Sequence, residues 1–421
     1  MNDVLILGSG GREHALTWKL SQSNLCNLIY IAPGNAGTQQ LGTNVDLDIT
    51  DFSSIGNFCL EKNIEYLIVG PELPLVQGIV DFFATTFPNI KVLGPDENAA
   101  QLEGSKDFAN RFMEKYKIPT AGYKTFSLDE ITEAKSHIEE SKGPYVLKAD
   151  GLAGGKGVLI FEDQNEAKKA IEEMLSGKFG EASSKVVVEE FLSGIEFSVF
   201  VITDGENYKL LPTAKDYKRI GEGDKGLNTG GMGAISPVPF VQPEIMNKVI
   251  EKIIQPTIAG FREENMNYKG FVFFGLILVE DEPYVIEYNC RLGDPETEVI
   301  LPRMDVDLMA IIKSVFNNQL SNTNIKFDPR TAATVMLVSG GYPQEYEKNK
   351  EILVPENYSN SVLFHAGTKA QDGKLFTNGG RVLSITSFGK DHIEATKKSM
   401  VVCKKVQFDG KYFRSDIGFD L

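Results

Sequence analysis

The chain has 421 residues, which is too long for a single hydrophobic core, so roughly two to four domains are expected. Hydrophobic residues make up 42% and charged residues 24%, proportions that are typical of globular proteins. The formal net charge of -15 argues against binding to nucleic acid or to an anionic membrane, because both are recognised through basic patches. The 4 cysteines show no C-x-x-C spacing, and no apolar run reaches the ~18 residues that cross a bilayer. The composition therefore predicts a cytoplasmic protein that binds neither nucleic acid nor membrane.

Short apolar runs in the N-terminal part each end in a turn rich in glycine or proline. The runs cover residues 4–7, 28–32, 66–69 and 90–93. Helical stretches separate them, which is typical of a parallel sheet with crossover helices. Ligands of such sheets bind beyond the carboxyl ends of the strands, so we expect the turns after all of these runs to line one crevice.

The first of these turns contains Gly8, Gly10 and Gly11 and leads into a predicted helix at residues 12–20. A dinucleotide motif, G-x-G-x-x-G, would need a glycine where Glu13 stands. Backbone N-H groups at the start of a helix still bind anions. The turn therefore favours a single phosphate over a pyrophosphate.

After a predicted long polar helix at residues 101–117, a smaller unit of about residues 121–191 carries a glycine-rich loop. We expect strands at residues 145–148, 158–161 and 186–190 and a helix near 165–175. Glycines in the loop at 149–157 let backbone N-H groups approach phosphate oxygens, and Lys148 and Lys156 add charge. A P-loop is excluded, because Gly157 stands where a serine or threonine would follow the lysine. A plain surface hairpin is the alternative.

A later predicted strand ends in a carboxylate, an amide and a guanidinium. Side chains two apart on a strand share a face, so Glu287 and Asn289 are expected to point the same way, with Val285 in their row and Tyr288 opposite. Two hard oxygen ligands suit Mg2+, which completes its coordination with phosphates and water. Arg291 follows, where its fork could grip a carboxylate or phosphate. An ordinary buried strand with a polar turn is the alternative.

The other expected elements surround this strand. They are a charged segment at 215–219, a glycine-rich loop at 226–233, a helix at 244–264 and a strand at 270–279. The C-terminal unit begins near residue 327, with strands at 332–338, 362–365 and 382–386 and a helix at 390–406. Its turn at 378–381 is expected to face the crevice.

Motifs spread along nearly the whole chain closely resemble the phosphoribosylamine-glycine ligase family of ATP-grasp enzymes. They are GSGGREHA at 8–15, GPE at 70–72, QLEGSK at 101–106, KADGLA at 148–153, NTGGMGA at 228–234, EYNCRLGDPE at 287–296 and FHAGT at 364–368. The resemblance implies an α/β fold with an α+β lid. It also implies a preATP-grasp N-terminal domain at 1–103, an ATP-grasp domain at 104–325 with a mobile lid of about 121–191, and a C-terminal domain at 326–421.

The resemblance further implies the ATP-dependent ligation of glycine to 5-phosphoribosylamine in purine (IMP) biosynthesis. The products would be glycinamide ribonucleotide, ADP and phosphate, and the reaction would pass through glycyl phosphate. ATP would be a co-substrate, Mg2+ or Mn2+ the metal, and the protein a monomer. The alternatives are an ATP-grasp ligase for another carboxylate and a non-catalytic ATP sensor that uses the same cleft.

Residue roles also follow from the resemblance, position by position. ATP would contact Lys106, Lys148, Gly154, Gly155, Lys156, Glu189, Glu190, Leu192 and Glu196. Phosphoribosylamine would contact Gly10, Gly11, Arg12, Glu13, Pro71, Glu72, Asn228, Gly230 and Gly231. Glycine would contact Asp216, Arg291 and Asp294, the metal would be held by Glu287 and Asn289, and Arg291, Lys148 and Asp216 would be catalytic. Many ATP-grasp enzymes place another acidic ligand on the preceding strand, but residues 273–278 offer none, so the number of bound metals stays open.

Overall fold

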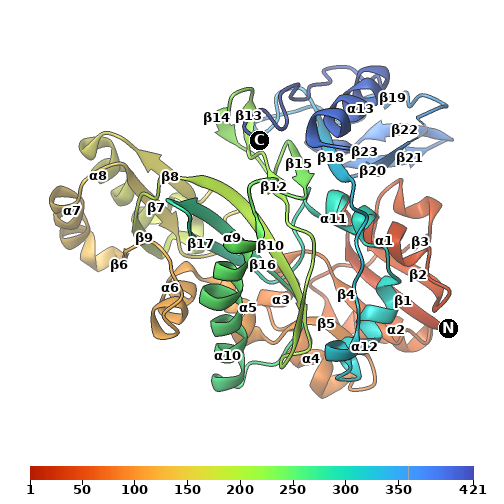
Figure 1. The fold of residues 1–421 in the computed structure, drawn as a ribbon, viewed down its shortest axis with the longest axis horizontal. Helices are drawn as coiled ribbons and strands as arrows, with labels where there is room; N and C mark the ends of the chain where they lie inside the picture. Colours follow the sequence, from red (N-terminus) through yellow and green to blue (C-terminus); the bar gives the residue numbers. More distant parts are fainter. Residues whose placement is uncertain (359) are drawn as a thin grey trace.

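The N-terminal part of the protein is a parallel sheet covered by helices (Figure 1). In the computed structural model, which describes residues 1–358 and 360–421, its strands are β1 (Asn2–Gly8), β2 (Cys26–Pro33), β3 (Thr43–Asn44), β4 (Tyr66–Val69) and β5 (Lys91–Pro95). The strand order is β5-β4-β1-β2-β3, and all neighbours are parallel. The helices are α1 (Gly11–Leu20), α2 (Phe52–Glu61), α3 (Glu72–Val76) and α4 (Ile79–Thr86). Continuous apolar runs form these strands because helices bury both faces, as the sequence predicts.

The carboxyl ends of these strands do not all stay open. Gly8 at the end of β1 pairs with Pro33 at the end of β2, so the first two turns lie side by side. The turn after β5 is covered, because β16 (Tyr268–Val279) starts there and pairs Lys269 with Gly94. The expectation that all of these turns line one crevice is therefore wrong for the turn after β5.

An antiparallel sheet extends the N-terminal sheet through β16. Its further strands are β10 (Ile195–Thr203), β11 (Tyr208–Leu210) and β17 (Glu282–Asn289). Strand β10 lies between β11 and β16, and β17 pairs with β16. Helices α9 (Pro243–Val249) and α10 (Gln255–Glu263), joined by a π-helical turn, pack on one face, as the predicted helix at 244–264 requires. Helices α11 (Thr297–Arg303) and α12 (Leu308–Phe316) pack on the other.

The helix predicted at 101–117 is two helices, α5 (Glu97–Gly104) and α6 (Lys106–Lys115). Ser105 between them is extended, and its hydroxyl oxygen caps α6 by accepting a hydrogen bond from the N-H of Phe108. The same hydroxyl donates to Asp150 Oδ1 at 2.8 Å, and the N-H of Asp107 donates to that oxygen at 2.8 Å. The prediction of one helix is wrong because a distant carboxylate stabilises the break.

The lid is a separate layer at one side of the molecule (Figure 1). Its strands are β6 (Tyr123–Ser127), β7 (Tyr145–Ala149), β8 (Val158–Phe161) and β9 (Lys185–Glu190), and its helices are α7 (Ile131–Glu140) and α8 (Gln164–Glu173). The antiparallel sheet has the order β6-β9-β7-β8. The helices bury Ile138 and Ile171 against Leu147 and Val186 in a core of their own. A unit with its own core can move as a body relative to the rest of the chain.

The C-terminal residues build a further sheet that residues of the middle region join. Its strands include β18 (Thr331–Val338), β20 (Ser361–His365), β23 (Arg381–Gly389), β12 (Lys215–Asp216) and β15 (Gly233–Ser236), in the order β12-β15-β18-β23-β20. Helix α13 (His392–Lys405) covers this sheet. Smaller elements are β13 (Arg219–Gly221) with β14 (Lys225–Asn228), and β19 (Glu351–Ile352) with β21 (Thr368–Gln371) and β22 (Lys374–Thr377). In the described part of the chain, no helix is long and apolar enough to cross a membrane.

The motifs at residues 8–15 and 364–368 meet where the C-terminal sheet packs on α1. The N-H of His365 donates to His14 Nδ1 at 2.7 Å, and burial lowers the pKa of both imidazoles, to about 4 for His365 and about 3 for His14. Asn35 Nδ2 donates to His365 O and to Ser9 O, each at 2.9 Å. The first glycine turn is thus fastened directly to the C-terminal sheet.

Candidate active site

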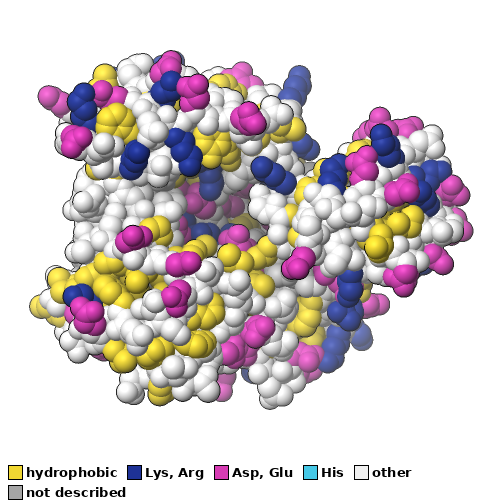
Figure 2. All heavy atoms as spheres, turned by 180° about the vertical axis from the view of Figure 1, so that it is seen from behind, with side chains coloured by type: hydrophobic (Ala, Val, Ile, Leu, Met, Phe, Trp, Pro, Cys, Tyr) yellow, Lys and Arg dark blue, Asp and Glu magenta, His cyan; other side chains and the backbone are white. Residues whose placement is uncertain are grey.

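A cavity of about 740 Å³, here called the larger cavity, lies where the lid, the body sheet and the C-terminal region meet. Its walls come from the glycine-rich loop between β7 and β8, the β9–β10 connection, β12, β17 and the turn at 293–296. Seen from behind, the central hollow has both basic and acidic side chains on its walls (Figure 2). Local positive charge can therefore bind phosphates on a protein whose net charge is -15.

Glu287 and Asn289 share one face of β17, as predicted, because they pair with Gly275 and Phe273 on β16. The rest of that row differs, since Leu276 pairs with Val285 and the register then shifts, which leaves Ile286 as the extra residue of a β-bulge. Val285 consequently packs in the core with Tyr288, and it borders the larger cavity together with Ile286. The predicted position of Val285 in the row of Glu287 is wrong, because alternation fails at a bulge.

The surroundings of Glu287 fit a carboxylate that holds a cation. Burial opposes ionisation, but Lys218, Lys106 and Lys148 outweigh it and hold the pKa of Glu287 below its usual range. Asn289 adds an amide oxygen and is 8% exposed. Within residues 1–358 and 360–421, no group of three or more His, Cys, Asp or Glu side chains could hold a metal ion. A carboxylate and an amide suit Mg2+ or Mn2+ where phosphate oxygens complete the coordination.

Lys148 links the lid to the body at the bulge. Its Nζ lies 2.6 Å from Glu189 Oε2 on β9 and donates to Ile286 O at 3.1 Å. Asn110 Nδ2 of α6 donates to the other oxygen of Glu189 at 3.2 Å. An ammonium has three N-H donors, so one remains for a ligand in the cavity.

The glycine-rich loop lies over the cavity with open space around it. Gly154 and Gly155 have φ values of +58° and +75°, and a Cβ at either position would meet no atom within 4 Å. Few side-chain contacts hold such a loop, so it can move at little cost. Lys106 reaches the same cavity from the first turn of α6.

Another wall of the larger cavity holds buried carboxylates whose ionisation is disfavoured. Burial raises the pKa of Asp216 on β12, and burial together with Asp216 raises the pKa of Glu296. Lys218 Nζ lies 3.0 Å from Glu196 Oε2, and Lys218 holds the pKa of Glu196 below its usual range. This wall therefore suits a ligand cation such as an ammonium group.

Arg291 is fixed by two acidic neighbours. Its Nη2 lies 2.6 Å from Glu103 Oε1, and its Nε lies 3.6 Å from Glu72 Oε2. Within the described part of the chain, the buried Nε has no hydrogen-bond partner. Glu103 orients the guanidinium, and its contacts with Glu103 and Leu292 O leave one N-H each on Nη1 and Nη2 for an anionic ligand.

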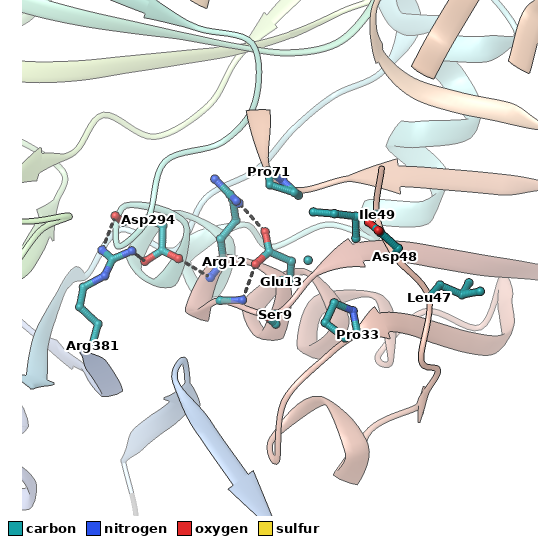
Figure 3. A pocket seen from close by; sticks show the side chains of 12 residues that line it. Ser9, Arg12, Glu13, Pro33, Leu47, Asp48, Ile49, Pro71, Asp294 and Arg381 are labelled. Atoms are coloured by element: carbon teal, nitrogen blue, oxygen red, sulfur yellow. Dashed lines mark hydrogen bonds and ion pairs between the residues drawn. The ribbon is translucent and has the colours of Figure 1, made fainter. Parts of the chain in front are cut away.

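A second cavity of about 500 Å³, the smaller cavity, lies beyond the carboxyl ends of β1 and β2 (Figure 3). The first glycine turn, Pro33, Pro71 and residues 47–49 line it. The chain's own carboxylates take donors of this turn, because the N-H of Gly10 donates to Glu13 Oε2 at 2.6 Å and the N-H of Arg12 donates to Asp294 Oδ2 at 3.3 Å. A phosphate bound here must rely on other donors or displace these carboxylates.

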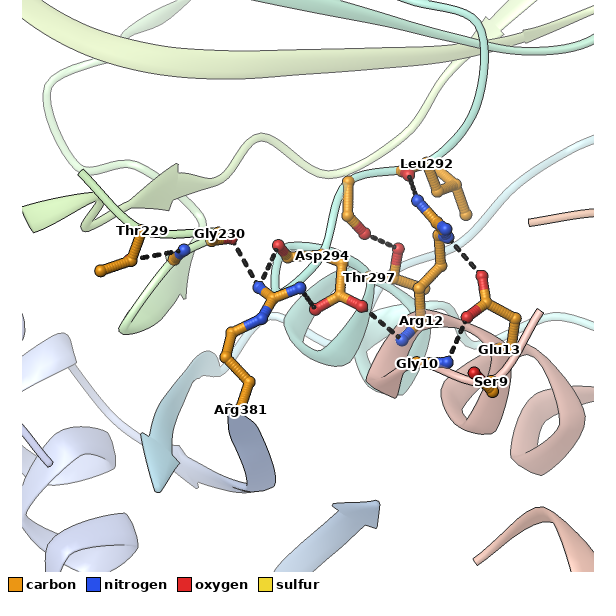
Figure 4. Close-up of polar contacts among 12 residues, drawn as sticks. Ser9, Gly10, Arg12, Glu13, Thr229, Gly230, Leu292, Asp294, Thr297 and Arg381 are labelled. Carbon is orange, nitrogen blue, oxygen red and sulfur yellow. Dashed lines mark hydrogen bonds and ion pairs between the residues drawn. The ribbon is translucent and has the colours of Figure 1, made fainter. Parts of the chain in front are cut away.

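The two cavities share one charged wall. Among the described residues, only Arg12, Asp294 and Arg381 line both. Figure 4 shows them as one chain of contacts, with Asp294 between the start of α1 and the guanidinium of Arg381. Ligands in the two cavities would therefore approach each other at this wall.

Comparison with known proteins decides which family has this arrangement. Family models described as the N domain, the ATP-grasp (A) domain and the C domain of phosphoribosylglycinamide synthetase match residues 2–103, 104–297 and 332–420. The chain is 46% identical over 422 residues to the phosphoribosylamine-glycine ligase of Vibrio parahaemolyticus, covering 99% of this chain and 97% of that protein. It is 44% identical over 423 residues to the ligase of the same name from Haemophilus influenzae, covering 99% and 98%. The chain belongs to the phosphoribosylamine-glycine ligase family.

Solved structures agree with this membership. The crystal structure of a phosphoribosylamine-glycine ligase from Thermotoga maritima matches with a TM-score of 0.86 and 37% identity, covering 98% of this chain and 99% of that one. The biotin carboxylase domain of 2-oxoglutarate carboxylase from Hydrogenobacter thermophilus matches with a TM-score of 0.74, 16% identity and coverage of 99% and 92%, which shows a shared fold. The predicted family and the predicted α/β fold with N-terminal, ATP-grasp and C-terminal domains are confirmed.

The structure brings most of the residues named by resemblance to this ligase family into the two cavities. Lys156, Gly11 and Gly231, all within the described part of the chain, line neither. Lys156 is exposed on the glycine-rich loop. A side chain at Gly11 would collide with Glu298, and one at Gly231 with Pro295. Close packing therefore explains these two glycines without a ligand.

Several charged residues of the larger cavity were not identified as site residues from the sequence. They are Glu103, Lys215, Lys218, Arg219, Asp224, Glu296, Arg381 and Asp420. Lys218 had a detectable signal, because it stands two residues after Asp216 in a charged run. No pattern in the sequence identifies Asp420, because tertiary contacts bring it to the site. It accepts a hydrogen bond from Tyr217 Oη at 2.8 Å and pairs with Lys215 at 3.2 Å.

Proposed function

We propose that this protein ligates glycine to 5-phosphoribosylamine at the expense of ATP, giving glycinamide ribonucleotide, ADP and phosphate in purine biosynthesis. The main support for this proposal is that the larger and smaller cavities share a wall formed by Arg12, Asp294 and Arg381. Such a wall suits a reaction in which an activated acid in one cavity meets an amine in the other. Membership of the ligase family supports the choice of glycine and phosphoribosylamine.

Glycine's carboxylate resists attack by an amine because its leaving group would be oxide. Transfer of the terminal phosphoryl group of ATP would convert it into glycyl phosphate, whose leaving group is phosphate. Such a transfer requires mainly positioning and charge neutralisation, which Lys148 and Arg291 would provide without a covalent enzyme intermediate. The phosphoribosylamine nitrogen would then attack the acyl carbon, forming the amide and releasing phosphate.

The nucleotide would occupy the lid side of the larger cavity. Lys106, Lys148 and the loop of Gly154, Gly155 and Lys156 would contact its phosphates. Glu189, Glu190, Leu192 and Glu196 would contact the adenosine part where β9 leads into β10. Glu287 and Asn289 would hold Mg2+ or Mn2+, which when bound would neutralise charge on the transferring phosphate.

The two other substrates would meet at the shared wall. Asp216 would hold the glycine ammonium, and Arg291, with Asp294 nearby, the glycine carboxylate. The raised pKa of Asp216, caused by burial, supports this role because an ammonium would stabilise its ionised form. Phosphoribosylamine would contact Gly10, Arg12, Glu13, Pro71, Glu72, Asn228 and Gly230.

We also propose a cytoplasmic monomer with boundaries at 103/104 and 325/326 and a lid of about 121–191. The separate lid core and the open glycine-rich loop support lid closure over the nucleotide. Closure would matter because water hydrolyses an acyl phosphate.

Steady-state phosphate release tests the proposed activity. Phosphate should appear with glycine, ATP and phosphoribosylamine generated in the assay, and not with glycine, alanine or bicarbonate alone. Release with bicarbonate alone would instead indicate a carboxylase. Binding of ATP without any release would indicate a nucleotide sensor.

Isotope labelling tests the intermediate. Glycine labelled with heavy oxygen in its carboxylate should transfer label to inorganic phosphate, with ADP as the nucleotide product. Label in AMP, with release of pyrophosphate, would exclude glycyl phosphate.

A further inference from the structure

Arg381 reaches from the C-terminal sheet into the shared wall (Figure 4). Its Nη1 donates to Gly230 O at 2.5 Å and to Asp294 O at 2.7 Å, and its Nη2 lies 3.0 Å from Asp294 Oδ1. One guanidinium therefore joins the loop around Gly230 to the turn that carries Asp294. A planar fork can hold such a set of acceptors, which a lysine ammonium cannot reproduce in the same geometry.

The loop at Gly230 is shaped around this arginine. A Cβ at Gly230 would lie 2.9 Å from Arg381 Cζ, so the guanidinium rests directly on the glycine backbone. The N-H of Gly230 donates to the hydroxyl of Tyr342, a second residue of the C-terminal region, at 3.0 Å. The C-terminal region thus binds both the N-H and the carbonyl oxygen of one residue in the cleft.

Asp294 carries the connection on to the N-terminal sheet. Its Oδ2 accepts from the N-H of Arg12 at the start of α1, and the Arg12 side chain donates from Nε to Glu13 Oε1 at 2.6 Å (Figure 3). Arg381 therefore connects the C-terminal sheet, the loop at Gly230 and, through Asp294, the N-terminal sheet at the wall between the two cavities.

We propose that Arg381 is a positioning residue that sets how phosphoribosylamine in the smaller cavity meets activated glycine in the larger one. This inference rests on the proposed function. The guanidinium of Arg381 contacts Gly230 O, Asp294 O and Asp294 Oδ1, so Arg381 acts through Gly230 and Asp294. Loss of Arg381 should weaken use of phosphoribosylamine while ATP binding, on the far side of the larger cavity, stays intact.

The electrostatics of Asp294 give an independent readout. Burial opposes its ionisation, but Arg381 first and then Arg12 hold the pKa of Asp294 below its usual range. The charged groups that face Asp294 are Arg12, Glu72, Arg291, Glu298 and Arg381. Without Arg381 the carboxylate should take up a proton at higher pH, so the acidic limb of the rate profile should move upward in pH.

Arg381→Met is the main test, with Arg330→Met as the matched control. Arg330 belongs to the same region but pairs with Asp328 at 2.6 Å and stacks on Phe388 away from both cavities. Michaelis constants for all substrates, kcat, its pH profile, ATP affinity by calorimetry and the melting temperature are measured for each protein.

For Arg381→Met we expect a rise of about 10-fold or more in the Michaelis constant for phosphoribosylamine, a shifted acidic limb, and ATP affinity within about 2-fold of wild type. Tyr342→Phe, which removes only the hydroxyl at Gly230, should raise the same constant less. Arg381→Lys should restore the acidic limb but not the Michaelis constant.

Equal changes in the constants of all three substrates, together with a lower melting temperature, would overturn the proposal in favour of a structural role. Full recovery of the phosphoribosylamine constant in Arg381→Lys would overturn it in favour of direct phosphate contact. Unchanged constants in Arg381→Met would also overturn it. A wild type that releases no phosphate would instead refute the proposed function, and this inference with it.

Discussion

The two cavities differ in how well their charged side chains are neutralised by neighbouring side chains of opposite charge. In the smaller cavity, Arg12 lies 2.6 Å from Glu13 and Arg381 lies 3.0 Å from Asp294, so each arginine has its own carboxylate. In the larger cavity, Asp216 disfavours ionisation of Glu296, and Glu196 disfavours that of Asp216. In the smaller cavity the chain thus supplies a carboxylate for each arginine, whereas in the larger cavity Lys218 and Lys215 do not offset the burial that raises the pKa of Asp216.

The glycine-rich segments of the two cavities also differ in how strongly neighbouring side chains hold them. The glycine turn of the smaller cavity is fixed by Glu13, Asp294 and Asn35. The glycine loop of the larger cavity has no atom within 4 Å of where a Cβ would stand on Gly154 or Gly155. The smaller cavity is preorganised, whereas ligands would order the loop of the larger cavity. A loop that is ordered only by its ligands lowers the cost of releasing products.

Among the substitutions in the larger cavity, Glu287→Gln should have the largest effect on turnover. Loss of one negative oxygen at the proposed metal pair should lower turnover on the order of 10³-fold, because charge on the transferring phosphate is no longer neutralised. The fold should persist, as judged by a cooperative thermal melt and an unchanged circular dichroism spectrum. Glu280→Gln makes the same chemical change at the exposed turn between β16 and β17 and should leave turnover intact. Near-normal rates for Glu287→Gln at ordinary Mg2+ would remove the residue from the metal site.

Arg291→Lys should raise the Michaelis constant for glycine more than that for ATP. A lysine keeps the charge but cannot keep both the 2.6 Å contact to Glu103 and a second donor toward glycine. We expect the Michaelis constant for glycine to rise about 10-fold to 100-fold, with a much smaller change for ATP. Arg262→Lys, at an exposed position of α10, is the control. A glycine constant equal to that of wild type would show that Arg291 does not hold the carboxylate.

Glu296→Gln should stabilise the ligand-free protein, whereas Asp294→Asn should destabilise it. The pKa of Glu296 is raised by burial and by Asp216, so its penalty to the folded state is absent below the ordinary carboxyl value and grows as pH rises. The pKa of Asp294 is lowered despite burial, chiefly by Arg381, so its stabilisation is present at neutral pH and lost in acid. Melting temperatures at pH 5 and 7.5 should show a gain of about 2 °C for Glu296→Gln only at the higher pH. A gain for Asp294→Asn at pH 7.5 would contradict the proposed difference between the cavities.

The sequence predicts local structure well because short patterns determine it. The apolar runs of β1, β2 and β4 become strands, and Glu287 and Asn289 share a face, because burial and alternation act over a few residues. The motifs also predict which segments carry the site. These features depend on neighbours in the sequence and so can be inferred from it.

Features created by distant contacts could not be predicted. The break at Ser105 depends on Asp150, the donors at the start of α1 are taken by Asp294, and Arg381 reaches Gly230 across 151 positions. The bulge at Ile286 shifts the register within one strand, and only the partner strand reveals it. Each of these features replaces a local preference with a tertiary hydrogen bond or pairing.

The smallest expected effect is a difference in hydrogen exchange between the two glycine-rich segments. If ligands complete the larger cavity, amides at residues 149–158 should exchange more slowly when Mg-ATP is added, because phosphate contacts order a loop that few side chains hold. Amides of the turn at 8–11 should change little, since Glu13 and Asp294 already fix it. The two segments serve as each other's control in one experiment. Equal exchange at 149–158 with and without nucleotide would mean a static hairpin, and the larger cavity would then be as preorganised as the smaller one.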